Sequence, residues 1–436
     1  TDERRRFAQL SHEYLIEQLQ FTGSEKISSG GTPCGDIGRA IEAALEGRYK
    51  NPYGKVKDSL GDEGVRAAGW GNDNDLGYTL IDCGQNSDKS CKIMISTCRE
   101  TSCSGAKFDM ANENGGVHGR QIRVVLEDHQ YQVPIHVKAM NKLMNLDKVF
   151  ATFNVLGTPM NLATAETQFA NNVPMLFPMT TAKSVQEPEH DLKITFGSSY
   201  YNQIRFAVGH FLATGRTSAC VMYQDTAYGA EVLEAVTDEV AEHSGVSLVS
   251  SFAHKPTDTE FVGAMVGFKG AGCDLIVFGT IIRDTITGYA TARKLGITAD
   301  VVVTQAGFDT MVAGFPGGIT EGLYAASVGE AVYCDSAPAS AQAFCDAYKA
   351  KHGTDPGISG QLGYTAADLV VAGLENAGAD LTVDSLMDGL EAISGHQDTF
   401  GRIGWSYGAD DHKGTQVVVL SQVQGGKWVS LGQATF

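Results

Sequence analysis

The sequence lacks the features that mark membrane-spanning, nucleic-acid-binding and metal-binding chains. No apolar run among its 436 residues approaches the roughly 20 residues that span a bilayer. Lys plus Arg number only 33 against 51 Asp plus Glu, which gives a net charge of −18. This balance argues against nucleic acid or anionic lipid as the main partner, because both bind basic surfaces. The 11 His are scattered and no Cys-x-x-Cys pair occurs, so the sequence predicts no metal site.

Motifs of the common catalytic classes are also missing. There is no Gly-x-Ser-x-Gly, no phosphate-binding glycine loop and no His-Glu-x-x-His. The 43% hydrophobic and 19% charged residues are nevertheless enough to bury a proper core. We therefore expect a folded, multi-domain protein that is not an enzyme and carries no cofactor.

Nine cysteines are many for a reducing compartment. Spacing makes Cys83 with Cys91, Cys98 with Cys103 and Cys334 with Cys345 candidates for disulfides. Cys220 and Cys273 lie in or beside apolar runs, and we expect them to be buried free thiols. The polar start of the chain has no signal-peptide character, so we expect a mature or trimmed chain in an oxidising compartment.

Two series of short apolar runs dominate residues 91–303. Within each series the runs are rich in β-branched residues and alternate with helix-length segments, as parallel strands with crossover helices do. Their centres, 24 to 31 residues apart within each series, are Ile93, Val124, Ala151 and Met175, then Cys220, Leu248, Ile276 and Val302. Two series of matching pitch predict an α/β fold with two doubly wound parallel-sheet lobes.

The trailing elements predict how the chain divides. Helices expected over 340–351, 361–377 and 383–393, and strands over 416–423 and from Lys427, cannot form a core alone, so we assign them to the two lobes. The predicted division is 91–198 with 328–412 as lobe 1, 199–327 with 413–436 as lobe 2, and 1–90 as a small, mostly helical N-terminal extension. Within the extension, spacing predicts helices over 2–19 and 36–46, and its function is not legible.

A run of turn motifs resembles a known family. The segment Asn112-Glu113-Asn114-Gly115-Gly116-Val117-His118-Gly119-Arg120-Gln121-Ile122 is similar to the N-E-x-G-G-x-x-G-R-x-[IV] turn of type I periplasmic solute-binding proteins, the family of the leucine/isoleucine/valine-binding protein. The similarity continues through 125–128, Gly157-Thr158, 172–181, 223–229, 293–296 and 425–428. It covers about residues 91–436, and residues 1–90 have no counterpart in that family.

Independently of the resemblance, open α/β sheets bind ligands at the carboxyl ends of their strands. Here those ends are expected in the loops 97–104, 154–160, 178–182, 224–228, 279–284 and 305–309. Gly157-Thr158-Pro159 is typical of a helix start, with a hydroxyl N-cap and proline in the first turn. A small carboxylate there would meet the positive end of the helix dipole.

The resemblance implies a site and a role. It implies that Thr158, Thr180 and Thr181 hold the carboxylate and amine of a ligand and that Tyr228 closes over it from the second lobe. The full set of expected ligand-binding residues is Gly157, Thr158, Met179, Thr180, Thr181, Tyr228, Thr280, Arg283 and Gln305. The family also implies a periplasmic protein that captures a small polar solute, an amino acid or an organic or aromatic carboxylate, for the membrane permease of an ABC transporter.

Some positions depart from the amino-acid binders of that family. Gln305 stands where those proteins usually place a carboxylate for the ligand ammonium, with Asp309 further on. Arg283 or Arg99 could pair a carboxylate, which favours an organic acid or another small polar molecule. Arg283 could equally pair with Asp284 or Asp309. The alternative functions are a ligand sensor of the same fold that signals to a partner and, less favoured, an enzyme whose site is not recognisable.

Overall fold

The computed structural model describes residues 77–81, 90–93, 98–402 and 404–436. Residues 76–436 form one compact unit. The helices expected over 2–19 and 36–46 lie outside the described residues, as do the side chains of the Cys83–Cys91 and Cys98–Cys103 pairs. Their pairing and the predicted helices stay predictions.

The first sheet contains the strands expected from the first series of apolar runs. Its strand order is β2-β3-β1-β4-β5-β6, and all neighbours are parallel except that β1 runs antiparallel to β3 and β4. The strands are β1 (Gly77–Ile81), β2 (Ser90–Ile93), β3 (Gln121–Asp128), β4 (Ala151–Phe153), β5 (Met175–Leu176) and β6 (Lys193–Ile194). Residues 77–81 therefore lie in this sheet, although the predicted N-terminal extension included them. The Gly-, Asp- and Asn-rich sequence around this short run hid its strand pattern.

The second sheet is larger and combines two parts of the chain. Its order is β13-β12-β11-β10-β9-β7-β8, in which β7 to β11 are parallel and β12 and β13 add an antiparallel hairpin. The strands are β7 (Ser218–Gln224), β8 (Ser247–His254), β9 (Leu275–Gly279), β10 (Asp300–Val303), β11 (Tyr324–Ser327), β12 (Val417–Gln424) and β13 (Lys427–Thr435). The second predicted series is confirmed in β7 to β10, and the C-terminal strands are confirmed in β12 and β13.

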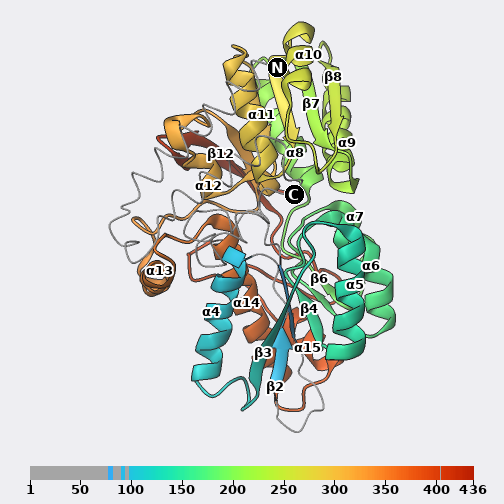
Figure 1. Ribbon diagram of the computed structural model, residues 1–436, viewed down its shortest axis with the longest axis vertical. Helices are drawn as coiled ribbons and strands as arrows, with labels where there is room; N and C mark the ends of the chain where they lie inside the picture. Colours follow the sequence, from blue (N-terminus) through green and yellow to red (C-terminus); the bar gives the residue numbers. More distant parts are fainter. Residues whose placement is uncertain (1–76, 82–89, 94–97, 403) are drawn as a thin grey trace, which may run out of the picture. The chain divides into compact units, whose positions relative to one another are not determined.

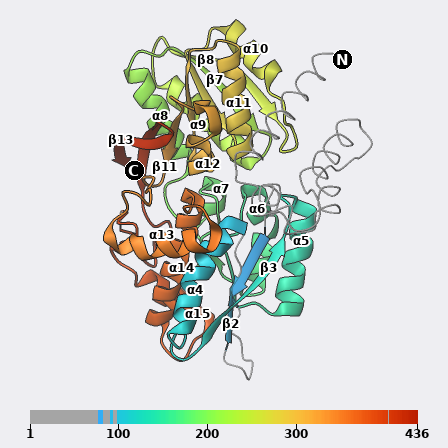
Figure 2. The ribbon, with the colours of Figure 1, turned by 60° about the vertical axis from the view of Figure 1, so that its left-hand side comes forward.

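Helices cover both sheets, as parallel sheets require. In Figures 1 and 2, α8 to α11 lie with the second sheet, and α4 to α7 with α14 and α15 lie with the first. The helices are α4 (Cys98–Glu113), α5 (Val133–Lys142), α6 (Thr158–Ala170), α7 (Lys183–Gln186), α8 (Tyr200–Ala213), α9 (Ala227–Ala241), α10 (Val262–Ala271), α11 (Ile282–Lys294), α12 (Thr310–Ala313), α13 (Ala339–His352), α14 (Ile358–Ala377) and α15 (Val383–Glu391). Short turns of helix occupy η2 (Leu143–Asp147), η3 (Gln305–Gly307) and η4 (Pro316–Gly318).

Burial explains why the strands could be predicted from the sequence. Every residue of β9 is buried because helices cover both faces of the central strands, so the sequence there is a continuous apolar run. The first five residues of the edge strand β8 alternate between exposed and partly buried positions, and the strand ends at buried His254. The three helices predicted near the C-terminus are confirmed in α13, α14 and α15, whereas the loop predicted over 97–104 is wrong because α4 already begins at Cys98.

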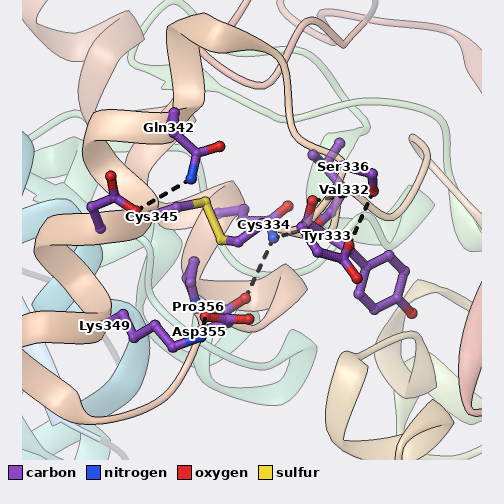
Figure 3. Close-up of a disulfide and its surroundings, with 12 residues drawn as sticks. Val332, Tyr333, Cys334, Ser336, Gln342, Cys345, Lys349, Asp355 and Pro356 are labelled. Carbon is purple, nitrogen blue, oxygen red and sulfur yellow. Dashed lines mark hydrogen bonds and ion pairs between the residues drawn. A yellow bond between two sulfur atoms is a disulfide. The ribbon is translucent and has the colours of Figure 1, made fainter.

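Two disulfides join described cysteines. Cys334 pairs with Cys345 as spacing predicted, and the bond ties the loop before α13 to that helix (Figure 3). Cys220 pairs with Cys273, so the prediction of two free thiols is wrong. These residues are 53 positions apart in the sequence, and only the sheet brings the start of β7 beside the residues that precede β9. In the part of the chain that the structure describes, no helix is long and apolar enough to cross a membrane.

Candidate functional site

The site begins where β4 and β5 of the first sheet end. Gly157 precedes α6 with φ 97° and provides no side-chain cap, and a proline lies in the first turn of the helix. Thr158 is the first residue of α6, so the expected hydroxyl N-cap is wrong. Its hydroxyl lies 2.7 Å from that of Thr180, which follows β5. The start of a 13-residue helix and two hydroxyl groups thus meet at one point, the arrangement that suits a small anion.

A tyrosine that sequence reasoning missed lies over this helix start. A Cβ built on Gly157 would lie 2.8 Å from the Tyr131 ring and 2.3 Å from Met160, so only glycine leaves room for the tyrosine here. The Tyr131 hydroxyl donates to Gln224 Oε1 of the second sheet at 3.5 Å. Tyr131, which follows β3 of the first sheet, is therefore hydrogen-bonded to Gln224 at the end of β7 in the second sheet.

A second link runs through Gln203 of α8. Its Nε2 donates to the Thr181 hydroxyl at 3.0 Å, and its Oε1 accepts from the backbone N–H of Gln305 at 3.0 Å. The Gln305 side-chain oxygen accepts from the N–H of Val328. Thr181, Gln203 and Gln305 therefore form one hydrogen-bonded chain across the site. Gln305 is held by these backbone contacts.

Tyr228 lies at the start of α9 and is 2% exposed. Its hydroxyl lies 2.7 Å from the Thr304 hydroxyl and donates to the Thr280 carbonyl oxygen at 3.2 Å. Its ring packs edge-on against Tyr200, with centroids 4.7 Å apart. The backbone N–H of Tyr200 donates to the Thr181 carbonyl at 3.3 Å, so two tyrosines connect Thr181 with Thr280 and Thr304.

Burial keeps these phenols neutral. Desolvation raises the pKa of Tyr200 to about 12, and it also raises the pKa values of Tyr131 and Tyr228. At neutral pH the three side chains are therefore uncharged hydrogen-bonding groups. They present no negative charge to an anionic solute.

The other predicted ligand residues, Met179, Thr280 and Arg283, pack against the core or already have hydrogen-bond partners. Thr280 is fully buried and its hydroxyl lies 2.7 Å from that of Thr285. Met179 packs partly buried against the main hydrophobic core. Arg283 is about half exposed and pairs with Asp284, one of the two partners expected, and it also donates to the carbonyls of Pro256 and Asp258. Arg99 lies in α4, and its side chain is outside the described residues.

Four residues of the site escaped sequence reasoning: Tyr131, Tyr200, Gln203 and Gln224. Gln224 ends β7 and was named only as a loop boundary, while Gln203 lies inside a helix. Tyr131 is held in a left-handed conformation with φ 53°, which no motif announces. Tyr131 and Gln224 lie at or just after the carboxyl end of a strand, and Tyr200 and Gln203 lie in the first turn of α8; both positions are too general to single these residues out.

Among the described residues, the predicted ligand residues take part in no metal-binding cluster, and the cavity described here lies elsewhere. Among the described residues, no group of three or more His, Cys, Asp or Glu side chains lies close enough to hold a metal ion. A cavity of about 550 Å³ opens between α8, α9 and the last residue, and none of the predicted ligand residues lines it. Its lining residues are Tyr201, Asn202, Arg205, Phe206, Gly209, His210, Glu239 and Phe436.

Comparison with known proteins assigns the fold to a family. The family model described as "Periplasmic binding protein" matches residues 102–427, about three-quarters of the chain. The chain therefore belongs to the periplasmic binding protein family. The resemblance seen in the turn motifs is confirmed over this range.

Individual relatives show the same fold. A leucine-, isoleucine-, valine-, threonine- and alanine-binding protein of Pseudomonas aeruginosa is 24% identical over 275 residues, 62% of this chain and 71% of that protein. A branched-chain amino acid ABC transporter structure from Thermus thermophilus with bound valine has a TM-score of 0.69 at 15% identity, and covers 78% of this chain and 92% of that one. A solute-binding protein of an ABC transporter from R. palustris in complex with benzoate has a TM-score of 0.67 at 16% identity, covering 77% and 91%.

A short match of a different kind also occurs. A stretch of 29 residues is 86% identical to the major capsid protein of Pyramimonas orientalis virus. It spans 7% of this chain and 7% of the capsid protein. A match of this size does not carry over the activity of a whole capsid protein.

Proposed function

We propose that this protein captures a small polar solute between its two lobes, outside the cytoplasm, and presents it to the membrane permease of an ABC transporter. The solute is an amino acid or an organic or aromatic carboxylate, and it leaves the protein chemically unchanged. The relatives described above are a binding protein for leucine, isoleucine, valine, threonine and alanine, a protein with bound valine, and a protein in complex with benzoate. They supply the precedent for both solute classes.

One observation carries the proposal. The start of α6 and the hydroxyls of Thr158 and Thr180 meet the network of Tyr200, Tyr228 and Gln203 across the site. A carboxylate docked at Thr158 would gain the field of the helix end and hydrogen bonds from two hydroxyls. Because the surrounding phenols are neutral, they would add hydrogen bonds and no repulsion.

The test is thermal unfolding and calorimetry with a panel of amino acids, aliphatic and aromatic carboxylates, short amides and urea. A solute at 100 times its Kd stabilises the folded state by about 2.7 kcal/mol, enough to raise Tm by a few degrees. We expect Thr158→Val and Thr180→Val to weaken binding of the same solute at least about tenfold, since each removes a buried hydroxyl that would contact it.

Two further results bear on the proposal. Thr287→Val is the matched control, because the Thr287 hydroxyl makes an exposed hydrogen bond within α11, to the Arg283 carbonyl, and binding should be unchanged. Mass spectrometry of the recovered solute should show no chemical change. The proposal fails if nothing in the panel shifts Tm, or if the recovered solute has been converted.

A further inference from the structure

Three buried polar side chains gather at the carboxyl end of the second sheet. Gln224 ends β7 and His254 ends β8, and the two are register partners in parallel strands, so their side chains leave the same face of the sheet. Asp284 lies in the first turn of α11, directly after β9. All three are at most 2% exposed. We call the group formed by Gln224, His254 and Asp284 the carbamoyl subsite.

Each of these side chains has one polar atom without a hydrogen-bond partner among the described residues. The three atoms are Gln224 Nε2, His254 Nε2 and Asp284 Oδ2, and all are removed from solvent. A buried polar atom without a partner costs about 1–3 kcal/mol. Three such atoms on neighbouring residues indicate a place that another molecule completes.

The residues are close enough to act together, and Tyr131 closes the group. Tyr131 donates to Gln224 Oε1 at 3.5 Å. The charge of Asp284 acts on Tyr131 and raises its pKa alongside the larger effect of burial. The strand order β9-β7-β8 places side by side the strand ends that carry or precede these three residues. Tyr131 also lies over Gly157, so the subsite adjoins the helix start at Thr158.

The hydrogen bonds already made decide what each free atom can do. Gln224 Oε1 accepts from Tyr131 and Thr226, which leaves Nε2 as a donor. His254 Nδ1 lies 3.0 Å from the Lys255 carbonyl, so Nδ1 donates a hydrogen bond, and in this tautomer of the imidazole Nε2 is an acceptor. Asp284 Oδ1 is held by Arg283, which leaves Oδ2 as an acceptor. The subsite therefore offers one donor and two acceptors.

Of the common polar groups of small solutes, the carbamoyl group completes this pattern. Its oxygen accepts from Gln224, and its NH2 has two hydrogens for His254 and Asp284. A carboxylate would face two acceptors, one of them charged. An ammonium or guanidinium group would leave the Gln224 donor facing another donor.

We propose that this subsite binds the carbamoyl group, –C(=O)NH2, of the transported solute. The proposal rests on the proposed solute-binding function. It selects amino acids with a terminal amide from the solute class proposed above, and it extends that class to simple primary amides and urea. Tyr131 positions the group by holding Gln224 in the donor orientation. A buried water molecule would satisfy the same three atoms and is the competing occupant.

Calorimetry on the full chain with matched solute pairs tests this. The pairs are glutamine with glutamate, propionamide with propionate, and urea with guanidinium, and the three pairs distinguish the sources of the carbamoyl group. We expect the carbamoyl member of at least one pair to bind at least tenfold more tightly. If solutes bind and no pair shows this preference, the carbamoyl assignment is overturned while the proposed function stands. If no solute of the wider panel binds, the proposed function itself fails.

Two substitutions sharpen the test. Gln224→Glu replaces the donor by an acceptor and should reduce the preference for the amide at least tenfold. In Asp284→Asn the amide oxygen can keep the contact with Arg283, and the amide NH2 then replaces Oδ2, so an acceptor becomes a donor. This variant should shift the preference towards the carboxylate of each amide–acid pair. Each readout is a ratio of two Kd values within one variant, so partial loss of folded protein does not imitate it. Gln424→Glu, the same change at the exposed end of β12, should leave the ratio unchanged.

A structure of the solute complex decides between solute and water. A carbamoyl group within hydrogen-bond distance of Gln224 Nε2, His254 Nε2 and Asp284 Oδ2 supports the proposal. A water molecule on those three atoms, with the solute elsewhere, overturns it.

Discussion

The carboxylate of Glu231 on α9 accepts a hydrogen bond of 2.8 Å from the backbone N–H of Lys183 at the start of α7. Its other oxygen accepts from the N–H of Tyr201 at 2.9 Å. One buried carboxylate thus joins the starts of two helices. One of these helices follows β5 of the first sheet, and Glu231 itself lies on a helix of the second.

This contact predicts a pH dependence of stability. Burial raises the pKa of Glu231 from 4.5 to about 7. The folded state therefore binds the proton more tightly than the unfolded chain, and the stabilising contribution is full below pH 4.5 and is lost as the pH rises through 7. Relative to Glu231→Gln, which cannot titrate, the wild type should gain about 2–3 kcal/mol of unfolding free energy between pH 8 and pH 5.

Urea unfolding of both proteins across this pH range measures the difference. Glu166→Gln, an exposed change on α6, should follow the wild-type pH profile. A constant difference between wild type and Glu231→Gln would show that Glu231 does not titrate in this range.

Gly157→Ala should damage both stability and solute binding. The position has φ 97°, and the new Cβ would lie 2.3 Å from Met160 and 2.8 Å from Tyr131. This backbone, with φ 97° and ψ 131°, is strained for any residue but glycine and alone costs an alanine about 1–3 kcal/mol, and displacement of Tyr131 adds to it. We expect Tm to fall by several degrees and solute affinity to fall with it.

The control for this change is Gly263→Ala in α10, where an added Cβ meets no atom within 4 Å. Alanine is the better helix former by about 0.8–1.0 kcal/mol, so this variant should be as stable as the wild type or more so. Equal behaviour of the two variants would contradict the role assigned to Gly157.

Tyr228→Phe should cost about 1–3 kcal/mol of unfolding free energy. The substitution keeps the ring against Tyr200 but removes the hydroxyl that bonds to Thr304 and to the Thr280 carbonyl, so two buried groups each lose a hydrogen bond, and the Thr304 hydroxyl keeps only the N–H of Ala306. Denaturant unfolding provides the measurement. Tyr324→Phe, a partly buried tyrosine that packs on Phe211, should change stability much less, and a similar loss in both would refute the hydrogen-bond argument.

The two disulfides should stabilise the protein to different extents. Cys220 and Cys273 are separated by 53 residues, and Cys334 and Cys345 by 11. In the chain-entropy description the longer loop contributes about 4 kcal/mol and the shorter about 3 kcal/mol. Guanidinium unfolding of the two double Cys→Ala variants should show the larger loss for Cys220/Cys273, and the reverse order would contradict the loop-length argument.

The sequence by itself determined the strand series, most helices and the family, because each follows from local pattern. Runs such as those around Cys220 and Ile276 are continuous and apolar because both faces of their strands are covered, and the Gly-rich turn at Gly115-Gly116 needs a backbone that only glycine adopts easily. Thr158, Thr180 and Thr181 were also placed correctly at strand ends, although their role in binding stays a prediction.

Only the tertiary structure decided which distant residues meet. It paired Cys220 with Cys273, placed Tyr131 over Gly157, and joined Thr181 to Gln305 through Gln203. It also left Gln224, His254 and Asp284 with free polar atoms at one place. The physical reason is that strand order and register set these distances, and neither is encoded in the local periodicity that makes single strands and helices legible.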